Sequence, residues 1–142
     1  MQGEIVVEQL DLADLANVAR CAARLALRLP SGCPDLLVLN AGVMATPPGA
    51  RTTDGFEMQI GTNFIGHQAL LQALLPRMRA VKSELGPAAA AGRVVVLTSM
   101  SHKWTTLDLH DLNFERRRYN PWVGYAQSKL ACVLMAKELA RR

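Results

Sequence analysis

The sequence is poor in the residues that build disulfide-linked and metal-binding proteins. Its 142 residues contain three cysteines, three histidines and only 5% aromatic residues. Cys21, Cys33 and Cys132 are odd in number, far apart and set among apolar neighbours, which predicts reduced, buried thiols rather than a disulfide framework. We therefore expect a reducing compartment such as the cytoplasm.

Long apolar runs are also absent. No run of eighteen apolar residues occurs, because Arg93 interrupts the strongest candidate, so we expect no membrane-spanning helix. Met1–Glu4 has neither the basic segment nor the apolar core of a secretory signal peptide, although a targeting segment outside these residues would not be visible. His67, His102 and His110 have no cysteine or carboxylate at ligand spacing, so we expect no metal site.

Basic residues outnumber acidic ones, for a net charge of +4, but most of them are scattered along the chain. The exceptions are Arg116–Arg118 and Arg141–Arg142. No aromatic residues interleave with a basic stripe, as a nucleic-acid surface would need, so we expect no nucleic-acid partner. We interpret the two clusters as a solvated loop, which includes Arg117, and a favourable helix C-terminus.

Continuous apolar segments alternate with amphipathic ones, as in α/β proteins. The apolar segments, which we expect to be buried strands, are Ile5–Leu10, Leu36–Leu39 and Val94–Leu97. The amphipathic segments, which we expect to be helices, run from about Asp14 to Leu29, Thr53 to Leu85 and Pro121 to Arg142. Pro76 is expected to bend the second helix, and residues 86–91 to form a loop. The pattern predicts one domain with a doubly wound parallel sheet covered by helices on both faces.

One pair of residues in the last expected helix carries a chemical signal. Tyr125 and Lys129 are four residues apart, so their side chains share a helix face. A fixed ammonium beside a phenol favours the phenolate and helps proton exchange near neutral pH. Ser99, at a nearby strand end, could hydrogen-bond the substrate oxygen atom that gains or loses the proton. This arrangement suits carbonyl/alcohol redox chemistry, although the spacing alone also fits a packed tyrosine and a solvated lysine.

Six short motifs occur in a fixed order along nearly the whole chain. They are Leu10–Leu12, Asn40–Gly42, Asp54–Glu57, Asn63–Gly66, Arg93–Ser101 and Tyr125–Lys129. In this order they resemble the short-chain dehydrogenase/reductase family and, within it, the retinol-dehydrogenase-like branch. The resemblance implies an NAD(P)-dependent oxidoreductase of Rossmann type. Its substrate would be a small alcohol, aldehyde or ketone of lipophilic character.

The resemblance also implies catalytic roles for four residues. Tyr125 would be the general acid/base, and Lys129 would support it and hydrogen-bond the nicotinamide ribose. Ser99 would orient the substrate oxygen, with Ser101 as an alternative that spacing does not exclude. Asn63 would hold a water that relays protons to Lys129, or would only bond backbone at a helix bend.

Further residues are implied in cofactor binding at the ends of the first two expected strands. They are Asp11, Leu12, Asn40, Ala41 and Gly42, joined by Tyr125 and Lys129. Asp11 would contact the adenine, but it could simply begin a helix, and Gly42 could serve only a tight turn. The branch favours NADP as the cofactor and leaves NAD open.

The family's glycine-rich turn, G-x-x-x-G-x-G, occurs nowhere in the sequence. That turn cradles the pyrophosphate of the dinucleotide. By the resemblance, residues 1–142 correspond to a central fragment of a single Rossmann domain, roughly strands three to five with their helices. The fragment would leave ladder groups of its first strand unpaired, so we expect low stability and weak dinucleotide binding.

Two other functions remain open. The chain could be a catalytically inactive, truncated Rossmann protein that acts as a binding or regulatory partner of a complete homologue. It could also be a sugar-nucleotide epimerase or dehydratase, which shares the Tyr–Lys pair on the same scaffold. The helices containing Asn63 and Tyr125 commonly form dimer interfaces in the family, so the resemblance implies that a homodimer could form through them.

Overall fold

The computed structural model describes residues 4–29, 31–85 and 92–141. The helices and strands of these residues alternate in the order expected for an α/β protein. They are α1 (Leu15–Arg28), β1 (Leu36–Leu39), α2 (Met58–Ile60), α3 (His67–Leu85), β2 (Arg93–Val96) and α4 (Pro121–Arg141). A π-helical turn, Gly61–Gly66, joins α2 to α3, and a 3₁₀ helix, Met100–Trp104, follows β2. No helix in the described part of the chain is long and apolar enough to cross a membrane.

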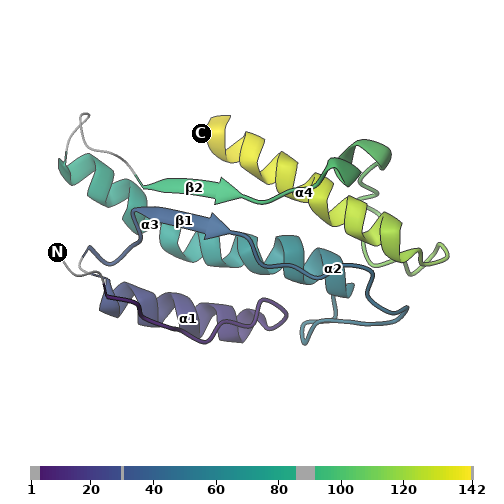
Figure 1. Ribbon diagram of the computed structural model, residues 1–142, viewed down its shortest axis with the longest axis horizontal. Helices are drawn as coiled ribbons and strands as arrows, with labels where there is room; N and C mark the ends of the chain where they lie inside the picture. The colour runs from purple at the N-terminus through teal and green to yellow at the C-terminus, as the bar shows by residue number, and fades with distance from the viewer. Residues whose placement is uncertain (1–3, 30, 86–91, 142) are drawn as a thin grey trace.

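Strands β1 and β2 form a parallel pair, with Leu36 opposite Arg93 and Leu39 opposite Val96. Both arrows point toward the end of the molecule where α2 and the first half of α4 lie (Figure 1). The Leu97 amide continues the ladder by donating to the Leu39 carbonyl at 3.0 Å. The parallel sheet confirms the predicted fold class, in the partial form that was expected.

The first expected strand is wrong. Ile5–Leu10 has no regular structure, and Ile5 and Val7 are 91% and 88% exposed. A strand is stable only when a neighbour satisfies its N–H and C=O groups. Among the described residues β1 and β2 pair only with each other, so the apolar segment has no ladder to join.

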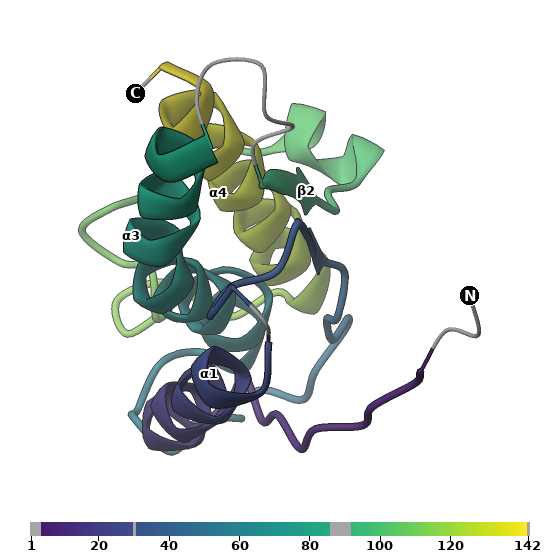
Figure 2. The same ribbon diagram turned by 90° about the vertical axis from the view of Figure 1, so that its left-hand side faces the viewer.

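The expectation that helices cover both faces of the sheet is also wrong for the described residues. Figure 2 shows α3 and α4 on one side of the two strands. Leu39 on that side is 2% exposed, whereas Leu36, Val38 and Val95 on the other side are 55%, 50% and 40% exposed. The strands therefore have one buried and one exposed face, although their sequences do not alternate.

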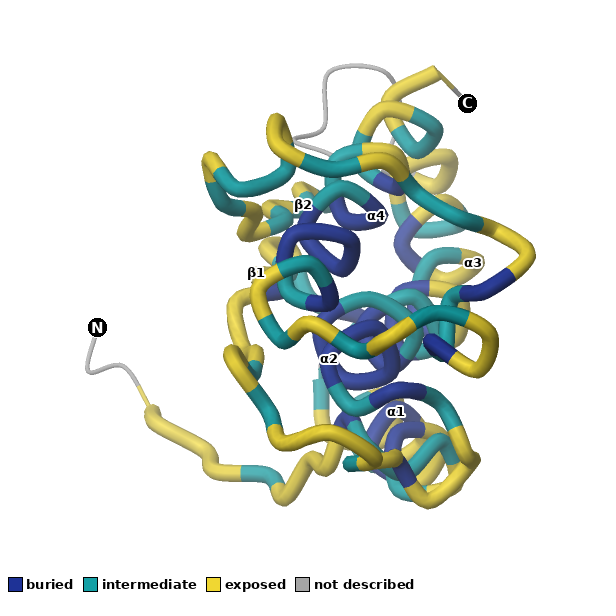
Figure 3. Tube along the Cα trace, turned by 90° about the vertical axis from the view of Figure 1, so that its right-hand side faces the viewer, coloured by how far each residue is buried: buried dark blue, intermediate teal, exposed yellow. Residues whose placement is uncertain are grey.

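The core lies between the inner faces of α1, α3 and α4 and the inner face of the strands (Figure 3). Its buried members are Leu12, Val18, Ala22, Cys33, Leu39, Leu70, Leu71, Leu74, Met78 and Met135. Helix α1 begins as predicted, with the Asp14 carboxylate accepting from the Asn17 amide at 2.9 Å. All three cysteines are free and buried, which confirms that they are buried thiols.

The long expected helix begins five residues later than Thr53, because residues 53–57 form a turn. The Glu57 carboxylate caps the first turn by accepting from the Gln59 amide at 3.0 Å and the Ile60 amide at 2.8 Å. Pro76 lies inside α3, which continues to Leu85, so proline does not end the helix. The loop expected at residues 86–91 lies outside the described residues.

Candidate active site

The candidate site lies where the carboxyl ends of β1 and β2 meet the first half of α4 (Figure 1). Parallel strands bring their carboxyl ends to one edge, which is where open α/β sheets bind ligands. Asn40–Gly42 follows β1 at this edge, and Thr98–Ser99 follows β2. These are the strand-end residues that the sequence pointed to.

Lys129 is tied to the end of β2 by its side chain and its backbone. Its Nζ donates to the Leu97 carbonyl at 3.3 Å, and its own carbonyl accepts from Thr98 Oγ1 at 2.9 Å. The side chain is buried, with 6% of the residue exposed, and Nζ lies 5.7 Å from the centre of the Tyr125 ring. The ammonium is therefore held beside the tyrosine, as the four-residue spacing predicts.

Asn63 lies in the π-helical turn, completely buried. Its Oδ1 accepts from the Val43 amide at 2.8 Å, and its Nδ2 donates to the Val43 carbonyl and to Ser128 Oγ, both at 2.9 Å. The side chain therefore joins the loop after β1 to α4. Gly42 lies between these groups: a Cβ there would come within 2.9 Å of Asn63 Oδ1 and 3.6 Å of Lys129 Nζ. The backbone at this position is therefore packed too closely for a residue with a Cβ.

Two donors converge on the backbone carbonyl of Asn63. His67 Nδ1 lies 3.0 Å from this oxygen and Cys132 Sγ lies 3.2 Å from it. Burial, and more weakly the Lys129 charge, lowers the pKa of His67, although the hydrogen bond to the Asn63 carbonyl opposes this. Burial raises the pKa of Cys132. A neutral imidazole and a neutral thiol can therefore both donate to this carbonyl.

Ser99 caps the 3₁₀ helix, and its Oγ accepts from the Ser101 amide at 3.2 Å. This contact uses an acceptor site and leaves the hydroxyl proton available. No hydrogen bond among the described residues joins Ser99 to Tyr125. Ser101 Oγ is buried without a hydrogen-bond partner in that part of the chain, so the alternative serine stays open.

Asp11 and Leu12 lie apart from this group. Asp11 is exposed, and its Oδ1 accepts from the Ala13 amide at 2.9 Å, which makes a turn before α1. Leu12 is 6% exposed and packs in the core, where its carbonyl leaves no room for a side chain at Gly66. The carboxylate of Asp11 is therefore accessible to a ligand, whereas the Leu12 side chain is not.

The chain's residues fit one part of a nicotinamide dinucleotide. An ammonium has three N–H donors, and within the described residues that of Lys129 hydrogen-bonds only the Leu97 carbonyl. A buried ammonium with donors to spare suits hydroxyl groups such as those of a ribose. The sequence offers no glycine-rich turn for the pyrophosphate, so the fit concerns the nicotinamide half.

Several residues of the site were not found from the sequence. Val43 and Ser128 hold Asn63, and a second cluster at the same edge is made by Glu57, Gln59 and Tyr119. Gln59 precedes Asn63 by four residues, so helical spacing could have placed it on the same face. Tyr119 lies in irregular chain, and no local pattern distinguishes it.

Arg117 corrects another expectation, because it is not a solvated loop residue. Its guanidinium lies 4.1 Å from the centre of the Phe114 ring, donates to Gln127 Oε1 at 2.7 Å and pairs with Asp111 at 3.4 Å. Burial alone would raise the pKa of Asp111, but three backbone N–H donors and the Arg117 charge lower it. Arg116 and Arg118 are exposed, as expected.

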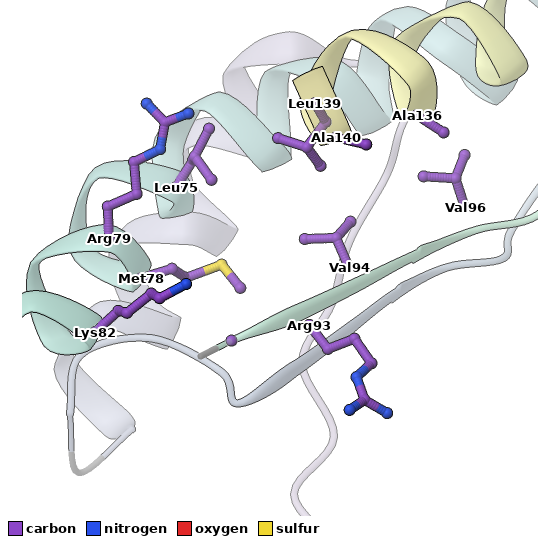
Figure 4. A pocket seen from close by; sticks show the side chains of 11 residues that line it. Leu75, Met78, Arg79, Lys82, Arg93, Val94, Val96, Ala136, Leu139 and Ala140 are labelled. Atoms are coloured by element: carbon purple, nitrogen blue, oxygen red, sulfur yellow. The ribbon is translucent and has the colours of Figure 1, made fainter. Parts of the chain in front are cut away.

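A larger hollow of about 460 Å³ lies away from this site, between the second halves of α3 and α4 and strand β2 (Figure 4). Its walls are mostly apolar, and Val94, Val96 and Leu139 point toward it, with Arg79 and Lys82 on its α3 side. Among the residues that the structure describes, no histidine, cysteine, tyrosine or serine lines it. Its described lining offers no side chain of the kind that acts as a nucleophile or general acid/base near neutral pH, so the carboxyl edge of the sheet remains the candidate site.

Known proteins are similar to this chain in sequence, and solved structures are similar to it in fold. No protein-family model matches it. It is 41% identical over 132 residues to a probable oxidoreductase of Streptomyces antibioticus, covering 93% of this chain and 40% of that protein. It is 41% identical over 133 residues to human retinol dehydrogenase 13, covering 94% and 37%. It is 47% identical over 133 residues to mouse polyprenol dehydrogenase, covering 93% and 37%.

Solved structures resemble this chain in fold. A crystal structure of an uncharacterized protein from Mycobacterium paratuberculosis is 44% identical, with a TM-score of 0.78, covering 100% of this chain and 46% of that one. A short-chain dehydrogenase from Streptomyces avermitilis matches in fold, with a TM-score of 0.63 at 23% identity, covering 94% and 42%. RhlG of Pseudomonas aeruginosa, solved with NADP, matches in fold with a TM-score of 0.62 at 23% identity, covering 93% and 45%.

These likenesses confirm the resemblance to the short-chain dehydrogenase/reductase family. The relatives' printed names are those of oxidoreductases, among them retinol dehydrogenases, so the resemblance to that branch is confirmed as well. The chain spans about two fifths of the length of these curated relatives.

Proposed function

We propose that the protein containing this chain is an NAD(P)-dependent oxidoreductase that interconverts an alcohol and an aldehyde or ketone. The observation that carries the proposal is the buried Lys129 ammonium held beside the Tyr125 ring at the carboxyl edge of the sheet. Burying a lysine ammonium is costly unless its charge is paired or hydrogen-bonded. A bound cofactor and the Tyr125 phenolate would supply such partners. The names of the relatives, which include retinol and polyprenol dehydrogenases, favour a lipophilic substrate.

The chain's own residues would orient the substrate and move its proton. A bound nicotinamide supplies or accepts the hydride. The Tyr125 hydroxyl would protonate the carbonyl oxygen during reduction, and its phenolate would take the proton from the alcohol during oxidation, while the Lys129 ammonium stabilises the phenolate. The Ser99 hydroxyl would donate a hydrogen bond to the substrate oxygen, since its own Oγ already accepts from the Ser101 amide. Asn63 positions the loop at Val43, and the second lone pair of its Oδ1 is left to hold the relay water.

The binding of the cofactor would be divided along the sheet edge. Lys129 and Tyr125 meet the nicotinamide ribose, while Asn40, Ala41 and Gly42, together with the Asp11–Leu12 turn, lie on the adenine side. NADP is the favoured cofactor, with NAD as the alternative. In this proposal residues 1–142 are the central part of a single Rossmann domain, in a reducing compartment, with helices that contain Asn63 and Tyr125 available for a homodimer.

The test begins with the intact mass of the gene product from its native cells. The full-length protein is then assayed for NADPH- and NADH-linked reduction of retinal and shorter aldehydes. Tyr125→Phe removes the proton donor and is expected to lower kcat by about 10²–10⁴-fold, whereas Arg118→Ala, an exposed control, should leave it unchanged. Unchanged turnover in Tyr125→Phe would refute the assignment.

The binding-partner alternative gives a different result. A native mass matching 142 residues, without measurable dinucleotide binding, would favour a catalytically inactive Rossmann protein. Micromolar affinity of the purified 142-residue chain for NADPH would contradict the weak binding expected of it.

A further inference from the structure

The loop that follows β1 is held by side chains from two distant segments. The Ala45 amide donates to Gln59 Oε1 at 2.9 Å, and the Tyr119 hydroxyl lies 3.0 Å from Thr46 Oγ1 and 3.2 Å from the Thr46 carbonyl. With Asn63 on Val43, three of the four residues Val43–Thr46 are fixed by hydrogen bonds. These contacts lie immediately after Gly42, at the edge where the candidate site opens.

The loop is held in an unfavourable backbone conformation. Ala45 has φ of 55°, in the left-handed region that residues with a Cβ rarely occupy. Such a residue persists only where its surroundings hold it, and these residues gather at functional sites. The hydrogen bond from its amide to Gln59 is the contact that holds it.

Gln59 reaches from this loop to the beginning of α4. Its Nε2 donates to the Tyr119 hydroxyl at 2.9 Å and to the Pro121 carbonyl at 2.8 Å, and its side chain is fully buried. Gly124 allows this approach, because a Cβ there would come within 2.9 Å of Gln59 Nε2. One amide therefore sets the distance between the loop after β1 and the turn of α4 that leads into Tyr125.

Tyr119 connects the same two parts to α2. Its hydroxyl lies 3.0 Å from Oε1 of Glu57, the carboxylate that caps α2, and its ring meets the edge of Phe114 with centroids 5.2 Å apart. Burial, followed by the charge of Glu57, raises the pKa of Tyr119. The phenol therefore stays protonated and can donate to the carboxylate.

We propose that Gln59 and Tyr119 are positioning residues of the redox site. They hold the strained Val43–Thr46 loop against the first turn of α4, and so fix Gly42 and Asn63 relative to Tyr125 and Lys129. Neither residue touches the reacting atoms. The catalytic consequence rests on the proposed function, whereas the hold on the loop does not.

Amide hydrogen exchange in the full-length protein tests the hold on the loop without any activity. Gln59→Leu removes the acceptor for Ala45, so exchange in a peptide covering Val43–Thr46 should become about tenfold faster. Gln72→Leu, at an exposed position of α3, should leave it unchanged. Unchanged exchange in a folded Gln59→Leu protein would overturn the inference. If Gln59→Leu fails to fold, the milder variant Tyr119→Phe replaces it. Faster exchange of the Val43–Thr46 peptide would then support the inference, and unchanged exchange would overturn it.

The kinetic readout separates positioning from general stability. Gln59→Glu keeps the Oε1 acceptor and removes the donor to Tyr119 and Pro121, so kcat per folded enzyme should fall about tenfold while KM changes less than about twofold. Normal kcat in Gln59→Glu and Tyr119→Phe would overturn the catalytic part. If Tyr125→Phe also left turnover unchanged, the proposed function would fail, and the exchange result would still decide the hold on the loop.

Discussion

The two halves of α4 are packed in opposite ways. Around Tyr125 the helix buries polar groups: Gln127 and Ser128 are completely buried and Lys129 is 6% exposed. Around Ala136 the same helix faces an apolar hollow of about 460 Å³. The first half is thus joined to its neighbours mainly by hydrogen bonds, whereas the second half packs Met135 in the core and borders the apolar hollow around Ala136.

This difference indicates that the side-chain arrangement is more strictly determined in the first half of α4 than in the second. A buried hydrogen bond has a preferred length and direction, and breaking it leaves a costly unpaired group. Apolar contacts have no direction and tolerate changes that keep the volume. The polar half should therefore respond sharply to small substitutions, whereas the apolar half should tolerate larger ones.

The largest loss of stability is expected from Asn63→Leu, which removes the hydrogen bonds that join the polar first half of α4 to the loop after β1. It would leave the Val43 amide, the Val43 carbonyl and Ser128 Oγ without this partner. We expect the free energy of unfolding to fall by about 2–4 kcal/mol, measured by urea denaturation of the full-length protein. Gln72→Leu is the exposed control, and a loss as small as in this control would contradict the comparison.

Arg117→Ala should have the next largest effect, because it removes the cation–π contact with Phe114 and the hydrogen bond to Gln127. The expected loss is about 1–2 kcal/mol in the same denaturation experiment. Its exposed neighbour serves as the matched control: Arg118→Ala should change stability by less than about 0.5 kcal/mol. Equal effects of the two variants would show that Arg117 is solvated after all.

His67 should make stability depend on pH. Its pKa is below the usual value in the folded protein because of burial, so the unfolded chain binds the proton more strongly. Stability should therefore fall as the pH drops below about 6.5, by at most about 1.4 kcal/mol per pH unit. His67→Gln should flatten this slope, while His110→Gln, at an exposed position, should not. A slope that survives in His67→Gln would assign it to other groups.

The smallest effect is expected in the apolar half, where added volume should be tolerated. Ala136→Leu adds apolar volume at the wall of the hollow at little cost in helix propensity, and should stabilise the protein by about 0.5–1 kcal/mol. Thermal unfolding measures the change, with Ala16→Leu on the exposed side of α1 as control. A clear loss of stability would mean that this half is packed as strictly as the other.

The sequence predicted the features that depend on nearby residues and missed those that depend on distant ones. The spacing of Tyr125 and Lys129, the helix that begins near Asp14 and the strand at Leu36–Leu39 depend on neighbours close in the chain, and the structure has all three. The failure at Ile5–Leu10 arose because a strand requires a partner that local sequence does not reveal. Gln59 escaped notice because its partner Tyr119 lies 60 residues away.

The π-helical turn at Gly61–Gly66 has a consequence for insertions and deletions. A π turn holds one residue more than an α turn, so the sequence positions of α2 and α3 are out of α-helical phase with each other. Deleting one of these six residues would let a continuous α-helix form with α2 and α3 in nearly the same relative orientation, because the π turn takes up one extra residue. If the turn became α-helical without a deletion, the segment before it would instead rotate by about 100° relative to α3, which would turn Gln59 and the Glu57 cap away from the loop. The π turn itself is thus part of the site, because it keeps α2 in register with α3 despite the extra residue.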